Sequence, residues 1–163
     1  MLIVFSGLPG TGKSTLARAL AEQLQATWLR IDSIEQALRD EGLAAVGTAG
    51  YRVANALAEA NLGLGLRVIA DGVNPVAESR QNWQAIAQRQ GVPLLNIEVI
   101  CSDLDEHRRR VEGRESQVPG LVLPTWQSVL EHDYQAWDTP PLRLDSAVLL
   151  PHEAVQVIVR HLG

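Results

Sequence analysis

The sequence reads GLPGTGKST at residues 7–15, following the run LIVFS at residues 2–6. The stretch matches the phosphate-loop pattern G-x-x-x-x-G-K-[ST]. The fixed positions of that pattern are Gly7, Gly12, Lys13 and Ser14. A buried strand before such a loop and a helix after it point backbone N–H groups and the positive end of the helix at phosphate oxygens. The sequence therefore predicts a site for the phosphates of a nucleotide.

The predicted loop assigns roles to side chains around ATP and its Mg²⁺ ion. Glycine allows the backbone to curve around the phosphates, Lys13 would contact the β- and γ-phosphates, and the Ser14 hydroxyl would bind Mg²⁺. The nucleotide-binding residues predicted in this way are Gly7, Gly10, Thr11, Gly12, Lys13, Ser14 and Thr15. The alternative is a glycine-rich turn without a ligand. It does not explain Lys13, the only lysine among fourteen basic residues.

The composition indicates a globular protein. The 163 residues are 46% hydrophobic and 20% charged, and they suit a single domain over 1–163. No apolar run approaches the ~20 residues of a membrane span, so we expect no membrane association. A net charge of −5 argues against broad binding to a long nucleic acid. A lone cysteine, Cys101, excludes an internal disulfide, and no signal-type leader is evident, so we expect a cytoplasmic location.

Apolar runs alternate with segments of helical periodicity, which is the pattern of a parallel sheet covered by helices. We predict strands at 2–6, 27–32, 67–72, 93–101 and 142–150. We predict helices at 13–24, 33–40, 49–64, 75–91, 102–114, 125–137 and 152–162. Ser33 and Ser102 would cap two of these helices, the first in a capping box with Gln36. Right-handed crossovers place helices on both faces of the sheet. The predicted fold class is therefore α/β, a three-layer α/β/α sandwich with a five-stranded parallel sheet.

Two aspartates end predicted strands, Asp32 in LRID and Asp71 in VIAD. Because the carboxyl ends of parallel strands meet at one edge of a sheet, both carboxylates should face Lys13. Asp71 would complete the Mg²⁺ site with Ser14. Asp32 would bind the acceptor and take the proton of its hydroxyl group as a general base. An aspartate at a strand end can equally be a helix cap or turn former, so both interpretations stay open for each residue alone.

The segment HRRRVEGR at residues 107–114 carries a cluster of arginines. Arg110 and Arg114 are four residues apart, so on a helix they would share a face. Guanidinium groups there would stabilise the charge that develops during phosphoryl transfer. The segment ESQVPG follows, and we expect 103–124 to form an arginine helix and a closing lid. A charged helix facing solvent is the alternative.

Contacts to the acceptor are predicted for Arg39, two turns along its helix, and for Asn74. Arg39 could meet an anionic group of the acceptor, although an arginine on a solvated helix face is the alternative. Arg80 and Tyr51 are further candidates for lining the acceptor pocket. The turn at 138–141 and the loop before the last helix are the regions where we look for contacts to the nucleotide base.

These motifs resemble those of the small phosphate-loop kinases, a group of the kind classed with AAA-type ATPases. Within them the chain is most similar to the zeta-toxin, chloramphenicol phosphotransferase and polynucleotide kinase branch. The resemblance rests on GLPGTGKST, an aspartate shortly after the first helix, VIADG and RRRVEGR. It implies a P-loop NTPase fold like that of nucleotide and shikimate kinases, a lid, and ATP with Mg²⁺ as cofactors. It implies the catalytic residues Lys13, Asp32, Arg110 and Arg114.

Three functions fit these observations. The leading hypothesis is an ATP-dependent phosphotransferase that moves the γ-phosphoryl group of ATP to a hydroxyl of a small-molecule acceptor. The second is a nucleoside monophosphate kinase or a 5′-hydroxyl polynucleotide kinase, and the chain's acidic balance disfavours the latter. The third is an ATP-binding regulator with little transfer activity.

Overall fold

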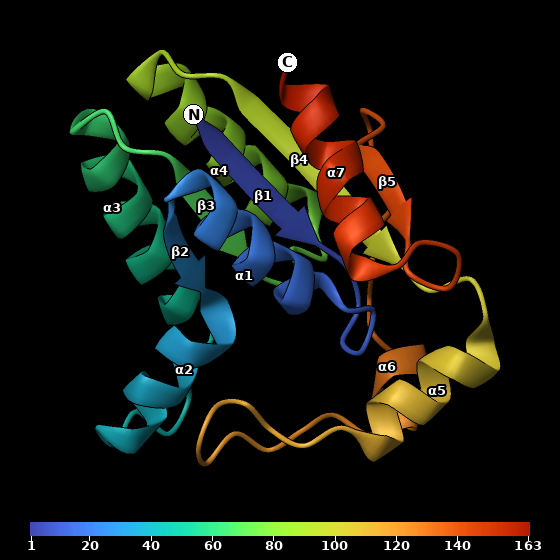
Figure 1. Ribbon diagram of the computed structural model, residues 1–163. Helices are drawn as coiled ribbons and strands as arrows, with labels where there is room; N and C mark the ends of the chain where they lie inside the picture. The colour runs from blue at the N-terminus through green and yellow to red at the C-terminus, as the bar shows by residue number, and fades with distance from the viewer.

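The computed structural model describes residues 1–163 and contains one five-stranded parallel sheet, in the order β2-β3-β1-β4-β5 (Figure 1). The strands are β1 (Leu2–Ser6), β2 (Thr27–Arg30), β3 (Val68–Asp71), β4 (Leu94–Ile100) and β5 (Leu142–Asp145). Every neighbouring pair is parallel, which confirms the predicted fold class. Arg30 is the register partner of Asp71, and Asp71 that of Phe5. The carboxyl ends of β1, β2 and β3 therefore lie side by side at one edge of the sheet.

Helices cover both faces of the sheet, as the crossover rule predicts. They are α1 (Lys13–Leu24), α2 (Ile31–Asp40), α3 (Ala49–Gly63), α4 (Ala77–Gln90), α5 (Leu104–Gly113), α6 (Trp126–Leu130) and α7 (Pro151–Leu162). Helices α1 and α7 pack on one face, and α3 and α4 pack on the other. Figure 1 shows α2, α5 and α6 beyond the carboxyl ends of the strands, where the loop after α5 extends towards α2. None of the helices combines the length and apolar character that crossing a membrane requires.

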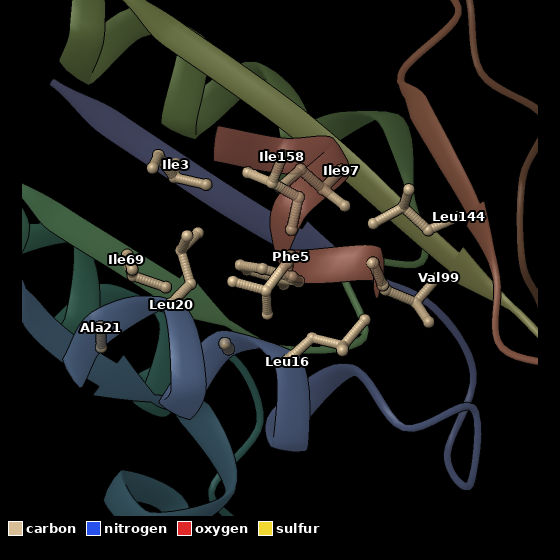
Figure 2. Packing of buried hydrophobic residues seen from close by; sticks show 13 residues of the cluster. Ile3, Phe5, Leu16, Leu20, Ala21, Ile69, Ile97, Val99, Leu144 and Ile158 are labelled. Carbon is tan, nitrogen blue, oxygen red and sulfur yellow. The ribbon is translucent and has the colours of Figure 1, made fainter. Parts of the chain in front are cut away.

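Alternating residues of β1 divide the core into two clusters. Ile3 and Phe5 belong to the cluster under α1 and α7, whereas Leu2 and Val4 belong to the cluster under α3 and α4. Figure 2 shows Phe5 among the side chains of the first cluster, which come from α1, α7 and the neighbouring strands. A strand that is buried on both faces has a continuous apolar run in its sequence. This burial holds β1 rigidly, and with it the start of the loop that follows.

Helix α2 begins earlier than predicted. The segment 27–32 was expected to be extended, but β2 ends at Arg30 and Asp32 lies in the first turn of α2. Arg30, with φ −91° and ψ 113°, is the N-cap, and no side chain caps the helix. The predicted capping box that begins at Ser33 is therefore wrong. The earlier start places Asp32 in the first turn of α2, directly after the carboxyl end of β2.

The cap of α5 is also one residue away from its predicted position. The Asp103 side chain accepts a hydrogen bond from the backbone N–H of Glu106, so Asp103 caps the helix. The backbone N–H of Ser102, the predicted cap, donates instead to the Asp145 carboxylate at 3.1 Å. Both residues are good caps, and this tertiary contact determines which one is used.

The predicted helix at 125–137 is mostly irregular. Thr125 caps α6 as its position after a proline suggests, but α6 ends at Leu130. The buried guanidinium of Arg80 donates to the carbonyl oxygens of Gln135 and Ala136 at 2.8 and 3.0 Å. Those carbonyl groups are directed towards Arg80 rather than along a helix axis. The predicted last strand, 142–150, is also shorter than expected, because the chain turns after Asp145.

Candidate phosphoryl-transfer site

The loop between β1 and α1 curves at glycines with positive φ, which are Gly7 at 141°, Gly10 at 82° and Gly12 at 91°. A Cβ atom on Gly7 would collide with the carbonyl oxygen of Val99. A Cβ atom on Gly10 would lie 2.5 Å from Cγ2 of Val111. These positions therefore require glycine both for the backbone conformation and for space. The loop has the curved form that the sequence predicts for a phosphate cradle.

Helix α5 supports the outer side of this loop through His107. The His107 ring is buried, and its Nε2 lies 2.8 Å from the carbonyl oxygen of Pro9. The ring also meets Trp126 edge to face, with centroids 5.1 Å apart. Any movement of α5 is therefore coupled to the phosphate loop. No feature of the sequence indicates this role, because a single histidine carries no spacing signal.

A cavity of about 410 Å³ opens on the inner side of the loop. The loop forms one wall, α2 forms a second, and the end of α5 with the segment after it forms the third. Predicted site residues that line the cavity are Gly10, Gly12, Lys13, Ser14, Thr15, Asp32, Arg39, Arg110 and Arg114. The fold thus brings together residues as far apart in the sequence as Gly10 and Arg114.

Lys13 and Asp71 are both buried, and the charge of each acts on the pKa of the other. Burial lowers the pKa of Lys13, while the Asp71 and Asp32 carboxylates act in the opposite direction. Burial raises the pKa of Asp71, while Lys13 and the Ser14 hydroxyl favour its ionised form. Oδ2 of Asp71 accepts a hydrogen bond from Trp28 Nε1 at 3.3 Å, and Oδ1 has no partner despite being buried. A buried carboxylate oxygen without a donor is unusual in a folded protein.

Contrary to the prediction, Arg110 and Arg114 do not share a helix face. Helix α5 ends at Gly113, and Arg114 is extended with φ −78° and ψ 145°. Arg110 donates to Glu106 and to both the hydroxyl and the carbonyl oxygen of Ser146. Burial lowers the pKa of Arg114, with Asp32 opposing that effect, and its buried Nε has no partner. One arginine is therefore fixed in position, while the other remains available to a ligand.

A second cavity of about 260 Å³ lies next to the first, and Gly12, Thr15 and Arg110 line both. Its remaining wall is the segment from β5 to the start of α7, including Leu149 and Leu150. The loop before the last helix is thus next to the phosphate loop, as predicted for contacts to the base. The turn at 138–141 does not line this cavity.

The two predicted acceptor contacts have different positions. Arg39 lines the first cavity and forms an ion pair with Glu35 at 3.5 Å. Asn74 is fully buried and does not reach the cavity. Its Nδ2 donates to the carbonyl oxygen of Phe5 at 2.9 Å, and its Oδ1 accepts from Trp83 Nε1 at 2.8 Å. Asn74 therefore holds the core together, and its prediction as a substrate contact is corrected.

Arg80 and Tyr51 have structural contacts of the same kind. The Tyr51 hydroxyl accepts a hydrogen bond from the backbone N–H of Asn74 at 3.0 Å, and burial raises the pKa of Tyr51 to about 12. Arg80 is buried and binds main-chain carbonyl groups. Conversely, Arg30 and Glu35 line the cavity although no sequence motif indicates them. Their nearness to Asp32 in sequence was the only available signal.

Comparison with known proteins assigns the chain to a family. Residues 2–132 match the model of a family described as an AAA domain. The chain belongs to this family. The adenylyl-sulfate kinase of Myxococcus xanthus, a relative of this AAA-domain protein, is 32% identical in an alignment 169 residues long, which covers 90% of this chain and 82% of the relative.

Solved structures confirm the fold of this AAA-domain protein. The Mycobacterium tuberculosis APS kinase CysC in complex with AMPPNP and APS has a TM-score of 0.72, with 20% identity over 99% of this chain and 96% of that one. A gluconokinase from Sinorhizobium meliloti has a TM-score of 0.65, with 18% identity over 98% and 91% of the two chains. Together with the curated relative, these kinases indicate an ATP-dependent phosphotransferase.

Proposed function

We propose that the protein transfers the γ-phosphoryl group of ATP to a hydroxyl group of a small-molecule acceptor. The supporting observation is the cavity of about 410 Å³, in which the phosphate loop, Asp32 and Arg114 line one space. Similarity to an adenylyl-sulfate kinase and a gluconokinase supports an acceptor of small size. The sequence resemblance to the zeta-toxin, chloramphenicol phosphotransferase and polynucleotide kinase branch supports a hydroxyl acceptor. A cytoplasmic location stays a prediction.

The nucleotide would span the two cavities. Its phosphates would bind the backbone amides of the loop and Lys13, and its base would enter the second cavity beside the Arg110 guanidinium and Leu149. The Ser14 hydroxyl and the unpartnered Asp71 Oδ1 are oxygen ligands of the kind Mg²⁺ prefers, so these residues fit that ion. When bound, Mg²⁺ would neutralise charge on the β- and γ-phosphates.

The acceptor would bind between Asp32 and the γ-phosphate. As its hydroxyl oxygen forms a bond to the γ-phosphorus, Asp32 accepts the hydroxyl proton and the bond from phosphorus to the leaving oxygen of ADP breaks. Lys13 and Arg114 would stabilise the negative charge on the transferring group. Arg39, at the outer part of the cavity, would bind an anionic group of the acceptor, and this would weaken its ion pair with Glu35.

The test combines an acceptor screen with the variant Asp32→Asn. ADP formation is measured with adenylyl sulfate, gluconate, chloramphenicol and nucleoside monophosphates as separate acceptors. We expect one hydroxyl acceptor to stimulate ADP formation, and Asp32→Asn to lower that rate at least 100-fold while MgATP affinity changes little. Transfer to a nucleoside monophosphate that survives the Asn substitution would contradict the general-base role, because a phosphate acceptor needs no such base.

A further inference from the structure

We propose that Arg30 binds the γ-phosphate of the nucleotide and acts with Arg114 as a second guanidinium on the transferring group. This inference rests on the proposed function and adds a catalytic residue that the sequence motifs do not indicate. It derives from the position of Arg30, from its incomplete set of hydrogen bonds and from the charges around it.

Arg30 is the last residue of β2, and its register partner on β3 is Asp71. Register partners on parallel strands project from the same face of a sheet. Trp28, two residues earlier on that face, donates to the Asp71 carboxylate, and the Arg30 guanidinium carbon lies 5.9 Å from the centroid of the Trp28 ring. Arg30 therefore lies beside the carboxylate that we assign to Mg²⁺, and it lines the same cavity as Lys13 and Ser14.

The guanidinium of Arg30 lacks strong partners. Its Nε is buried without any hydrogen-bond partner, and its one hydrogen bond runs from Nη1 to Gln117 Oε1 at 3.3 Å. No carboxylate lies within ion-pair distance of Arg30 or Arg114, whereas the other two arginines that line the cavity, Arg39 and Arg110, are each paired with a glutamate. Arginine donors that are desolvated and unpaired match the oxygens of a phosphoryl group.

The charges in this part of the cavity favour an additional anion. Lys13, Arg30 and Arg114 are close enough that each of the two arginines lowers the pKa of Lys13, and Arg30 lowers that of Arg114. In all, five basic side chains line the cavity against three carboxylates, those of Asp32, Glu35 and Glu115, and Asp71 near Lys13 adds a fourth, which leaves one cation in excess. A γ-phosphate beside Lys13 would supply the missing negative charge and accept hydrogen bonds from both arginines. MgADP has no group at that position.

Two other roles for Arg30 predict different results. If Arg30 only packs on Trp28 and contacts Gln117, its loss would change stability but not nucleotide affinity. If it binds an anionic part of the acceptor, its loss would change the KM of the acceptor without affecting the nucleotide. The neighbouring Asp71 favours the nucleotide, whereas Arg39 on α2 lies nearer the outer part of the cavity.

The experiment is calorimetric titration of the protein with MgADP and with MgAMPPNP. Arg30→Gln removes the charge, Arg30→Lys keeps it without the two-pronged donor geometry, and Arg18→Gln is a matched control at an exposed ion pair. We expect Arg30→Gln to weaken MgAMPPNP binding about 10- to 100-fold, which corresponds to the loss of one or two charge-assisted hydrogen bonds. The affinity for MgADP should change less than about twofold. Arg30→Lys should fall between Arg30→Gln and the wild type.

Equal losses for the two nucleotides in Arg30→Gln, or no loss for either, would overturn the inference. Both results would leave the proposed function intact, because the wild-type protein would still bind MgATP and could still pass the Asp32→Asn test. Failure of the proposed function alone would also give a result of its own. An AMPPNP-specific loss in a protein that shows no acceptor-dependent transfer would support Arg30 as a γ-phosphate ligand and count against the proposed function alone.

Discussion

Replacing Asn74 by Gly should destabilise the protein without weakening nucleotide binding. The substitution leaves Trp83 Nε1 buried without an acceptor and removes the shorter of two hydrogen bonds to the carbonyl oxygen of Phe5. That oxygen keeps a 3.3 Å contact from the N–H of Gly72. An unsatisfied buried group costs about 1–3 kcal/mol and a net hydrogen bond about 0.5–1.5 kcal/mol, so the free energy of unfolding should fall by about 2–4 kcal/mol.

Asn74→Ala is the matched comparison, because Asn74 has φ 46° and alanine is strained in that conformation. Alanine should therefore cost a further ~1 kcal/mol relative to glycine. Urea unfolding measures both variants, and calorimetry with MgATP at low temperature should give affinities within about threefold of the wild type. A loss of less than 1 kcal/mol in Asn74→Gly, or a large loss of affinity in a variant of unchanged stability, would refute a purely structural role.

Three further predictions concern the site itself. Gly10→Ala should abolish MgATP binding by calorimetry, because the new Cβ would be 2.5 Å from Val111 in a backbone with φ 82°, and unchanged binding would show that the loop can rearrange. Asp71→Asn should stabilise the nucleotide-free protein near pH 7, because burial raises the pKa of Asp71 by more than Lys13 lowers it, so the folded wild type loses stability as the pH rises from 3.8 through the raised pKa. Urea unfolding should show this gain shrinking as pH falls towards 3.8, and a gain independent of pH would contradict it. Arg110→Ala should weaken MgATP binding about 10-fold but leave the binding of Mg-tripolyphosphate nearly unaffected, because Arg110 borders the cavity assigned to the base. Equal losses of affinity for the two ligands would instead mean that Arg110 binds the phosphates.

The sequence predicted the fold because its strongest signals are local. The apolar run of β1, the glycine spacing and the periodicity of α1 and α7 are all properties of short segments, and they are confirmed. Errors arise where distant residues determine the local structure. Arg80 draws carbonyl groups away from a helix at 131–137, and the Asp145 carboxylate holds the N–H of Ser102.

The same distinction applies to the site. Lys13, Ser14 and Asp32 line the cavity as their motifs predict. Asn74 has the chemistry of a substrate contact, but its burial depends on Trp83 and Phe5, which sequence spacing cannot reveal. Arg30 was missed for the opposite reason. Its importance comes from strand register with Asp71, a pairing between distant positions that no motif records.

The most direct measurement is calorimetric titration of MgATP into the wild-type protein and into Lys13→Ala. Lys13 is the only lysine in the chain, and it is buried at the start of α1 beside Asp71. We expect saturable binding of one MgATP per chain by the wild type, and a loss of at least about 100-fold in Lys13→Ala, since charge-assisted phosphate contacts are lost. Absence of binding by the wild type, or equal affinity in the variant, would contradict the assignment of this loop as the ATP site.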